Sequence, residues 1–138
     1  CIRDRKISDA SVRDNPDVNA LASRGEDAVT VMVFNYHDRN AIQVKPTPVT
    51  LNLEAIPSNK VLVSQYRVDE EFSNSYTAYK AMGSPKNPTP EQIDQLEQAG
   101  QLQLFTSPQY MQVKDGKLTL NLDLPRQGVA LFKVEFVQ

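Results

Sequence analysis

Acidic side chains are the groups in this sequence whose chemistry would serve catalysis most directly. Two carboxyl groups held roughly 5 to 5.5 Å apart cleave a glycosidic bond with retention of configuration, and about 6.5 to 9.5 Å apart with inversion. Glu70 and Glu71 are sequence neighbours, and they point in different directions if the preceding strand continues through them. Glu91, Asp94 and Glu97 fall on the solvent side of a predicted helix. We therefore interpret these carboxylates as solvated surface groups rather than as a catalytic pair.

The other patterns that carry chemistry are incomplete. His37 is the only histidine and Cys1 the only cysteine, so the residues for a histidine-rich metal site or a zinc set are missing. A serine hydrolase needs a Gly-x-Ser-x-Gly turn and a phosphate site needs a glycine-rich loop, and neither motif occurs. The sequence therefore predicts no metal, no cofactor and no catalytic residues within this chain.

The composition is that of one globular domain. Of the 138 residues, 40% are hydrophobic and 23% are charged, which is enough for one substantial core. The formal net charge is -2 and the pI is near 5.4, and the basic residues are scattered, so nucleic-acid binding is not expected. No apolar run approaches transmembrane length, so membrane insertion is not expected either.

Short alternating runs predict a mainly β fold. The first four predicted strands read as a β-meander, and Asp115-Gly116 reads as the turn of a later hairpin. Thr89-Pro90 marks the start of a helix that ends near Gly100, and a weaker helical pattern covers residues 73–82. We predict an antiparallel β-sandwich with a helix-containing insertion at about residues 70–100. The predicted strands cover residues 18–22, 28–36, 49–53, 61–68, 101–105, 110–113, 118–122 and 129–136.

The insertion is the segment most suited to carry function, because polar and aromatic residues interrupt a strand-rich domain there. Ser73, Asn74 and Tyr76 are our candidate substrate-binding residues, since they offer hydrogen bonds and a stacking surface. In the alternative interpretation, Tyr76, Tyr79 and Met82 pack the insertion onto the sandwich, and Ser73 caps a short helix.

Four motifs in and around the insertion resemble those of the family 39 glycoside hydrolases, which include β-xylosidases and α-iduronidases. The motifs are Tyr66-Arg67-x-Asp69, Ser73-Asn74-x-Tyr76, Met82-Gly83-Ser84-Pro85 and Pro88-Thr89-Pro90-Glu91-Gln92.

The resemblance implies a retaining glycosidase as the parent protein, with its two catalytic glutamates in an upstream (β/α)₈ barrel. This chain resembles the β-sandwich that follows the barrel, with residues 1–17 as a connector and residues 18–138 as an accessory domain. The resemblance also implies a xylose-containing oligosaccharide as substrate and a parent that is periplasmic or secreted. The insertion is then expected to lean over the barrel and to form one wall of the sugar cleft.

Two other functions fit the same residues. An independent carbohydrate-binding module would use a tyrosine platform, for which Tyr36, Tyr66, Tyr79 and Tyr110 are candidates. A purely structural or oligomerisation domain would only stabilise the parent enzyme. His37-Asp38 is expected to form a turn, and Arg126 is expected to orient the start of the last strand.

Overall fold

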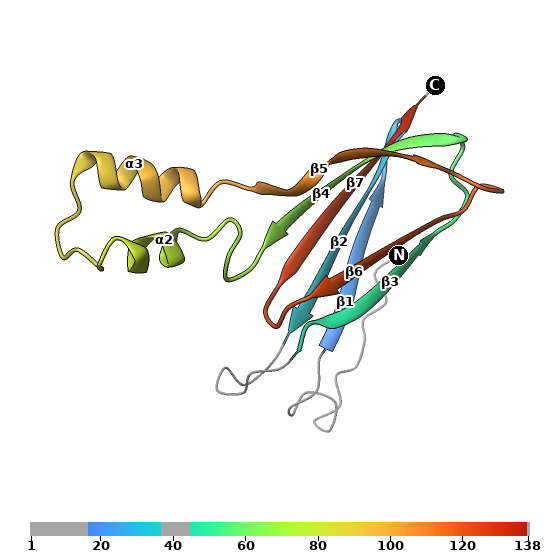
Figure 1. The fold of residues 1–138 in the computed structure, drawn as a ribbon. Coiled ribbons are helices and arrows are strands. Elements are labelled where there is room, and N and C mark those ends of the chain that lie inside the picture. The colour runs from blue at the N-terminus through green and yellow to red at the C-terminus, as the bar shows by residue number, and fades with distance from the viewer. Residues whose placement is uncertain (1–16, 37–44, 138) are drawn as a thin grey trace.

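Two antiparallel sheets pack face to face in the computed structural model, which describes residues 17–36 and 45–137 (Figure 1). The larger sheet has the strand order β1-β2-β7-β4-β5, and the smaller sheet pairs β3 with β6. The prediction of a mainly β sandwich with a helix-containing insertion is confirmed. The predictions for Cys1, His37, Asp38 and residues 1–16 of the connector lie outside the described residues. The strands are β1 (Asp17–Arg24), β2 (Ala28–Tyr36), β3 (Thr47–Leu53), β4 (Lys60–Val68), β5 (Gln103–Gln112), β6 (Leu118–Leu124) and β7 (Val129–Val137).

The core lies between the two sheets, because the strands alternate inward and outward residues. Strand β6 shows this most clearly: its four leucines are buried, and the three polar residues between them are exposed. The larger sheet contributes the facing layer from its three central strands. The buried residues of that layer are Val31, Val33, Val61, Val63, Ala130, Phe132 and Val134.

Asn35 links the sheets by a buried polar contact. Its side chain is 1% exposed, and Nδ2 donates to the Leu124 carbonyl at 3.1 Å and to Thr47 Oγ1 at 3.2 Å. Asn35 belongs to β2, whereas Thr47 and Leu124 belong to the smaller sheet. The bonds satisfy the amide N–H groups, which would otherwise be costly to bury, whereas the buried Oδ1 makes no hydrogen bond within the described residues.

The predicted β-meander is wrong. Strand β3 leaves the larger sheet and pairs with β6, and the last strand, β7, inserts between β2 and β4. Alternation indicates which residues face the core, but it contains no information on which strands are neighbours. Only the hairpin of β1 and β2 keeps the predicted neighbours among the first four strands.

One ten-residue strand, β5, replaces the two strands predicted at residues 101–105 and 110–113. Pro108 separates those runs in the sequence, but β5 is an edge strand, where a missing backbone N–H is tolerated. The pairing with β4 shifts register between Val63 and Tyr66, which accommodates the irregular stretch.

The Asp115-Gly116 turn is present, with φ values of 51° and 71°, but it does not form the predicted hairpin. Only the bridge between Lys114 and Lys117 spans it. Beyond the bridge, β5 pairs with β4 and β6 pairs with β3, so the turn passes the chain from one sheet to the other.

The insertion between β4 and β5 contains two helices, α2 (Ser75–Ala81) and α3 (Pro90–Ala99), and projects beyond the ends of the sheets (Figure 1). Thr89 and Gln92 form a capping box at the start of α3, as expected for a helix that begins with Thr-Pro. Ser75 Oγ donates to the Leu96 carbonyl at 2.8 Å and thus joins the two helices. None of the described helices is long and apolar enough to cross a membrane.

Candidate functional site

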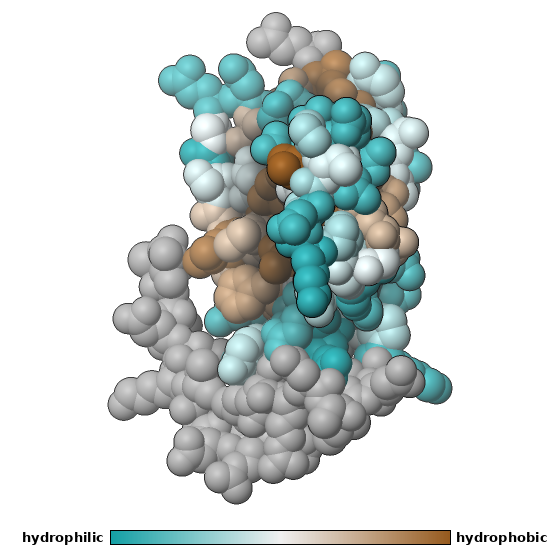
Figure 2. All heavy atoms as spheres, turned by 90° about the vertical axis from the view of Figure 1, so that its left-hand side faces the viewer, coloured by the Kyte–Doolittle hydropathy of each residue, from teal (hydrophilic) through white to brown (hydrophobic). Residues whose placement is uncertain are grey.

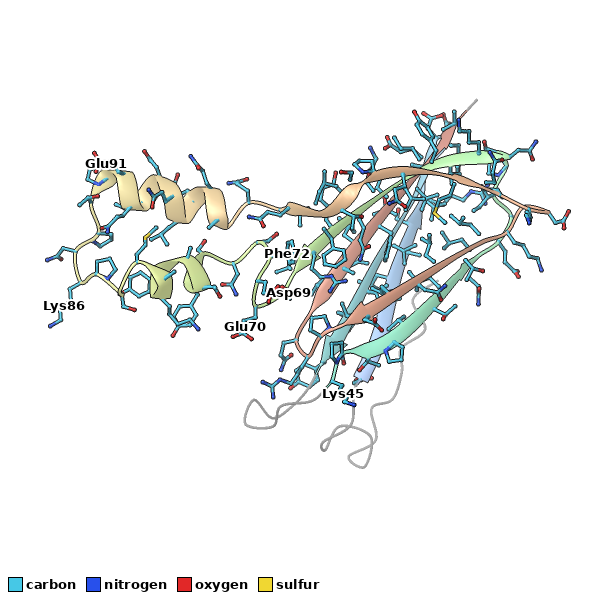
Figure 3. All side chains as sticks on the ribbon, in the orientation of Figure 1. Lys45, Asp69, Glu70, Phe72, Lys86 and Glu91 are labelled. Carbon is cyan, nitrogen blue, oxygen red and sulfur yellow. The ribbon has the colours of Figure 1, made fainter. Side chains whose placement is uncertain are left out.

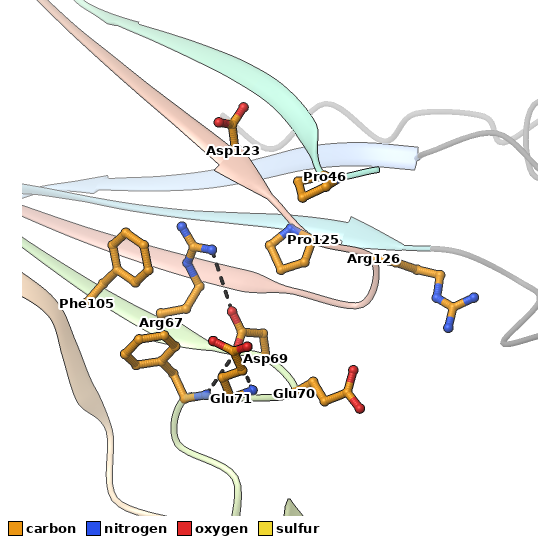
Figure 4. A pocket seen from close by; sticks show the side chains of 10 residues that line it. Pro46, Arg67, Asp69, Glu70, Glu71, Phe105, Asp123, Pro125 and Arg126 are labelled. Atoms are coloured by element: carbon orange, nitrogen blue, oxygen red, sulfur yellow. Dashed lines mark hydrogen bonds and ion pairs between the residues drawn. The ribbon is translucent and has the colours of Figure 1, made fainter. Parts of the chain in front are cut away.

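A pocket of about 490 Å³ lies where β4 ends and the insertion begins (Figure 4). It combines six charged side chains with two phenylalanine rings and two prolines, so it is more polar than a typical small-molecule site. The end of β6 and the turn that follows it form the opposite wall. The residues that line the pocket are Pro46, Arg67, Asp69, Glu70, Glu71, Phe72, Phe105, Asp123, Pro125 and Arg126.

Arg67 is the buried charge of this pocket. It occupies an inward position of β4 and is 4% exposed. Its Nη1 lies 3.6 Å from Asp69 Oδ2, and its guanidinium carbon lies 4.1 Å from the centroid of the Phe105 ring. The ring covers one face of the guanidinium, and the carboxylate offsets its charge.

Asp69 fixes the turn that leads from β4 into the insertion. Its Oδ1 accepts hydrogen bonds from the backbone N–H groups of Glu71 at 2.8 Å and Phe72 at 2.9 Å. The turn directs the Phe72 ring against Phe105, with the centroids 5.2 Å apart in an edge-on arrangement. The Arg-x-Asp spacing therefore serves both the buried ion pair and the start of the insertion.

Ser73, a predicted binding residue, joins the two strands at the base of the insertion. Its Oγ donates to the Arg67 carbonyl at 2.8 Å and accepts from the Gln103 N–H at 2.8 Å. The residue has φ 54°, a left-handed conformation that is uncommon for serine. Both hydrogen bonds are internal, so the contribution of Ser73 to this structure is structural.

Replacing Ser73 by alanine should therefore lower the free energy of unfolding by about 1–3 kcal/mol, because the Gln103 N–H loses its acceptor. Urea unfolding followed by circular dichroism measures the change. Ser107→Ala is the control, since Ser107 is exposed on the same edge strand, and it should change the stability by no more than about 0.5 kcal/mol. Equal effects of the two substitutions would contradict this role for Ser73.

Asn74 is the N-cap of α2, so the alternative interpretation, in which Ser73 capped this helix, is wrong. The Oδ1 of Asn74 accepts from the N–H groups of Tyr76 and Thr77. Its Nδ2 donates to the carbonyl groups of Asp69 and Glu70. Four internal bonds thus hold the amide in place and connect the helix to the turn before it.

Tyr76 is the predicted binding residue that the structure leaves accessible. Its side chain is 64% exposed, and Lys80 Nζ lies 4.9 Å from the ring centroid. Tyr79, in contrast, donates its hydroxyl to the Pro85 carbonyl at 3.2 Å, within the insertion. The predicted packing of Tyr76 onto the sandwich is therefore wrong, because the helices project away from the sheets.

Two of the tyrosines proposed for a binding platform, Tyr36 and Tyr110, lie far apart. Tyr36 is the last residue of β2. Tyr110 pairs with Leu62, and the register across β7 sets Leu62 level with the first residue of β2, at the opposite end of the sheet. Eight strand residues span about 26 Å at the usual rise, so one short sugar chain cannot stack on both rings.

Two exposed groups have shifted pKa values. Hydrogen bonds from its own backbone N–H and from Thr89 lower the pKa of Glu91, and the Glu135 carboxylate raises the pKa of Lys133 through a 2.7 Å bond. Glu91 lies at the far tip of the insertion with Lys86, remote from Asp69 and Phe72 (Figure 3).

No three histidine, cysteine or acidic side chains of residues 17–36 and 45–137 come together as a metal site.

The sequence interpretation missed Arg67 and Phe105 as members of a pocket. The alternation of β4 could have indicated Arg67, because it places this arginine on the side of the strand that faces the core, where a charge needs a partner. Phe105 gave no comparable signal, because its place opposite Arg67 depends on the register of β5.

Comparison with known proteins identifies a family. The model of the glycosyl hydrolases family 39 matches residues 3–113. A search of curated proteins finds no match. Similar solved structures include the GH39 enzyme from Xanthomonas axonopodis pv. citri, at 21% identity over 86% of this chain with a TM-score of 0.73. A monomeric β-xylosidase from Caulobacter crescentus is 18% identical over 86% of this chain, with a TM-score of 0.72.

A bacterial orthologue of human α-L-iduronidase is also similar, at 21% identity over 87% of this chain with a TM-score of 0.68. At these identities the likeness shows a shared fold. The matched region is 26%, 26% and 22% of the three solved chains, so this chain spans about a quarter of their length.

Proposed function

This chain belongs to glycosyl hydrolase family 39, and we propose that it is a non-catalytic accessory domain of a retaining glycosidase. In this proposal, residues 18–138 pack against a (β/α)₈ catalytic barrel of the same protein, and residues 1–17 connect the two. The insertion shapes one wall of the sugar cleft. The similarity to a β-xylosidase from Caulobacter crescentus supports a xylose-containing glycoside as the substrate.

The observation that carries the proposal is an apolar row on the outer face of the larger sheet. The strand register sets five residues side by side, one from each strand. Each is half-buried or exposed in this chain. Figure 2 shows hydrophobic residues exposed in the middle of the molecule and along one flank. The residues of the apolar row are Leu21, Met32, Leu131, Tyr66 and Leu104.

The outer face of the smaller sheet has the opposite character. Thr50 Oγ1 donates to Asn121 Oδ1 at 2.9 Å, and Thr119 Oγ1 donates to Asn52 Oδ1 at 3.0 Å, all on exposed residues. A polar ladder of this kind suits water, whereas the apolar row gains free energy when another surface covers it. The larger sheet is therefore the face that we assign to the catalytic domain.

The charged groups of the chain support a non-catalytic role. Asp69, the most enclosed carboxylate of the pocket, is bound to Arg67 and to two backbone N–H groups. These contacts are internal, so the carboxylate fixes the turn and the buried ion pair rather than facing a substrate. The proposed parent supplies its two catalytic glutamates from the barrel.

Kinetics on the parent enzyme test the proposal. The chain alone should not hydrolyse 4-nitrophenyl β-D-xyloside, whereas the whole enzyme should. In the whole enzyme, Tyr76→Ala should lower kcat/KM about fivefold, since one aromatic contact contributes roughly 1 kcal/mol.

Tyr110→Ala is the matched control. Tyr110 is 63% exposed, close to the 64% of Tyr76, and a lysine likewise lies over its ring, with Lys60 Nζ 4.3 Å from the centroid. It belongs to the outer face of the larger sheet rather than to the insertion, so its removal should lower the stability of the whole enzyme if the catalytic domain covers that face, but should leave kcat/KM unchanged. Turnover by the chain alone would overturn the accessory role, and equal kinetics for the two variants would overturn the role in the cleft.

A further inference from the structure

The two helices of the insertion bury none of their residues in this chain. Helix α2 has seven residues and α3 has ten, and each of these residues is half-buried or exposed. Helices of this length are marginal in water unless another surface covers an apolar side of them. The insertion therefore needs more packing than its two helices give each other.

The apolar side chains of the insertion gather where the two helices face each other. A Cβ at Gly100 would lie 2.5 Å from Ser75 Oγ, so the Gly100 side of α3 faces α2. Ile93 and Leu96 lie seven and four residues before Gly100, which places them on the same side of α3. The corresponding positions of α2 follow Ser75 at the same spacing. We call this set the seam, and it consists of Ser75, Ala78, Tyr79, Met82, Ile93, Leu96 and Gly100.

The seam remains partly open to solvent. Ile93 is 44% exposed, and the other apolar side chains of the seam are half-buried. Two helices form a single layer, and an apolar stripe on one layer is stable when a second layer covers it. The sheets do not supply that layer in the described part of the chain, because the insertion projects beyond their ends (Figure 1).

We propose that the seam is a docking surface for the catalytic domain of the parent enzyme, and that docking stabilises the insertion. This inference rests on the proposed function. It adds a second contact between the two domains, at a distance from the outer face of the larger sheet. The cleft wall that the insertion provides is then formed only when the domains are docked.

The outer face of the larger sheet identifies the occupant of the seam. The apolar row, which we assign to the catalytic domain, includes Tyr66 and Leu104. Val68 lies two residues after Tyr66 on the same face and is 39% exposed, and Leu102 precedes β5 and is 50% exposed. Exposed apolar residues therefore continue from the row to the root of the insertion, along both strands that carry it. A partner that covers the row also reaches the insertion.

The remaining sides of the helices suit water. Glu91 and Asp94 lie on the side of α3 that points away from Gly100, and both are exposed. Burying these carboxylates without partners would be costly, so this side of α3 is not the docking surface. Tyr76 follows Ser75 by one residue and lies on the flank of α2, so its proposed contact with the sugar and the docking of the seam use different sides.

Amide hydrogen exchange, followed by mass spectrometry, compares residues 75–99 in the isolated chain and in the whole enzyme. We expect exchange there to be at least about tenfold slower in the whole enzyme, because covering one large apolar side chain suffices for that protection. Strand β7, which lies between β2 and β4, should exchange slowly in both proteins. The isolated chain is measured at two concentrations. Protection that rises with concentration would assign the seam to a second copy of this chain and would overturn the proposal.

Ile93→Gln tests the seam directly, since glutamine keeps the helix propensity and removes the apolar contact. In the whole enzyme this variant should bring exchange of residues 75–99 to within about threefold of the rate in the isolated chain. Its effect in the isolated chain should be smaller, because Ile93 is already 44% exposed there. Asp94→Gln is the matched control at the next position of α3, and it should leave the exchange unchanged.

Two results would contradict docking of the seam: equal exchange of residues 75–99 in the isolated chain and the whole enzyme, or equal effects of the two glutamine variants. Leu131→Asp distinguishes this failure from failure of the proposed function, because Leu131 belongs to the apolar row. If only the seam is free of the catalytic domain, Leu131→Asp still destabilises the whole enzyme more than the chain. If the chain does not pack on a catalytic domain at all, that difference disappears as well.

Discussion

Replacing Phe132 by alanine should lower the free energy of unfolding of this chain by about 3–5 kcal/mol, the range typical of a buried phenylalanine. Phe132 is 3% exposed and lies in β7, between β2 and β4. Hydrogen-bonded strands on both sides hold the backbone in place, so the cavity left by the ring cannot collapse fully. Urea unfolding followed by far-UV circular dichroism measures the loss.

Leu102→Ala is the control for this prediction. Leu102 is 50% exposed and precedes β5, so its truncation should change the stability by no more than about 0.5 kcal/mol. A cost below about 1 kcal/mol for Phe132→Ala would contradict a core enclosed between the two sheets. An unchanged m-value in both variants would show that the unfolded state exposes a similar surface.

Local signals in the sequence predict local structure well in this chain. Thr89 is the N-cap of α3 and Pro90 is its first residue, as predicted, because these groups are neighbours along the chain. The four leucines of β6 are buried as their alternation predicts. Asp115 and Gly116 adopt the positive φ values that their residue types favour. Each of these features depends on neighbours along the chain.

The neighbours of strands could not be predicted in the same way. The insertion of β7 between β2 and β4, and the departure of β3 to the smaller sheet, are decided by packing between segments far apart in the sequence. The candidate site shows the same limit. Ser73 and Asn74 have polar atoms suited to a ligand, but the backbone of the insertion uses those atoms, and only the folded structure reveals this.

Leu131→Asp should destabilise the whole enzyme by several kcal/mol while costing the isolated chain about 1 kcal/mol. Leu131 lies in the same strand as Phe132, one residue earlier, so its side chain points to the opposite face of the sheet. There it occupies the middle of the apolar row. In the chain alone the aspartate is partly hydrated. Against the catalytic domain it would be an unpaired buried charge, which costs far more than a lost methyl group. Thermal unfolding of both proteins by calorimetry measures the difference.

Thr50→Asp is the matched control, because Thr50 belongs to the polar outer face of the smaller sheet and is exposed. It should affect the chain and the whole enzyme equally, by no more than about 0.5 kcal/mol.

The effect of Leu131→Asp also distinguishes between two partners that would bury the apolar row, a second copy of this chain and the catalytic domain. If a second copy of this chain covers it, the isolated chain sediments as a dimer, and Leu131→Asp converts that dimer to a monomer. If the catalytic domain covers it, the isolated chain is a monomer in both forms, and the large effect appears only in the whole enzyme. Equal effects of Leu131→Asp in a monomeric chain and in the whole enzyme would contradict the proposed packing, because the row would then face water in both.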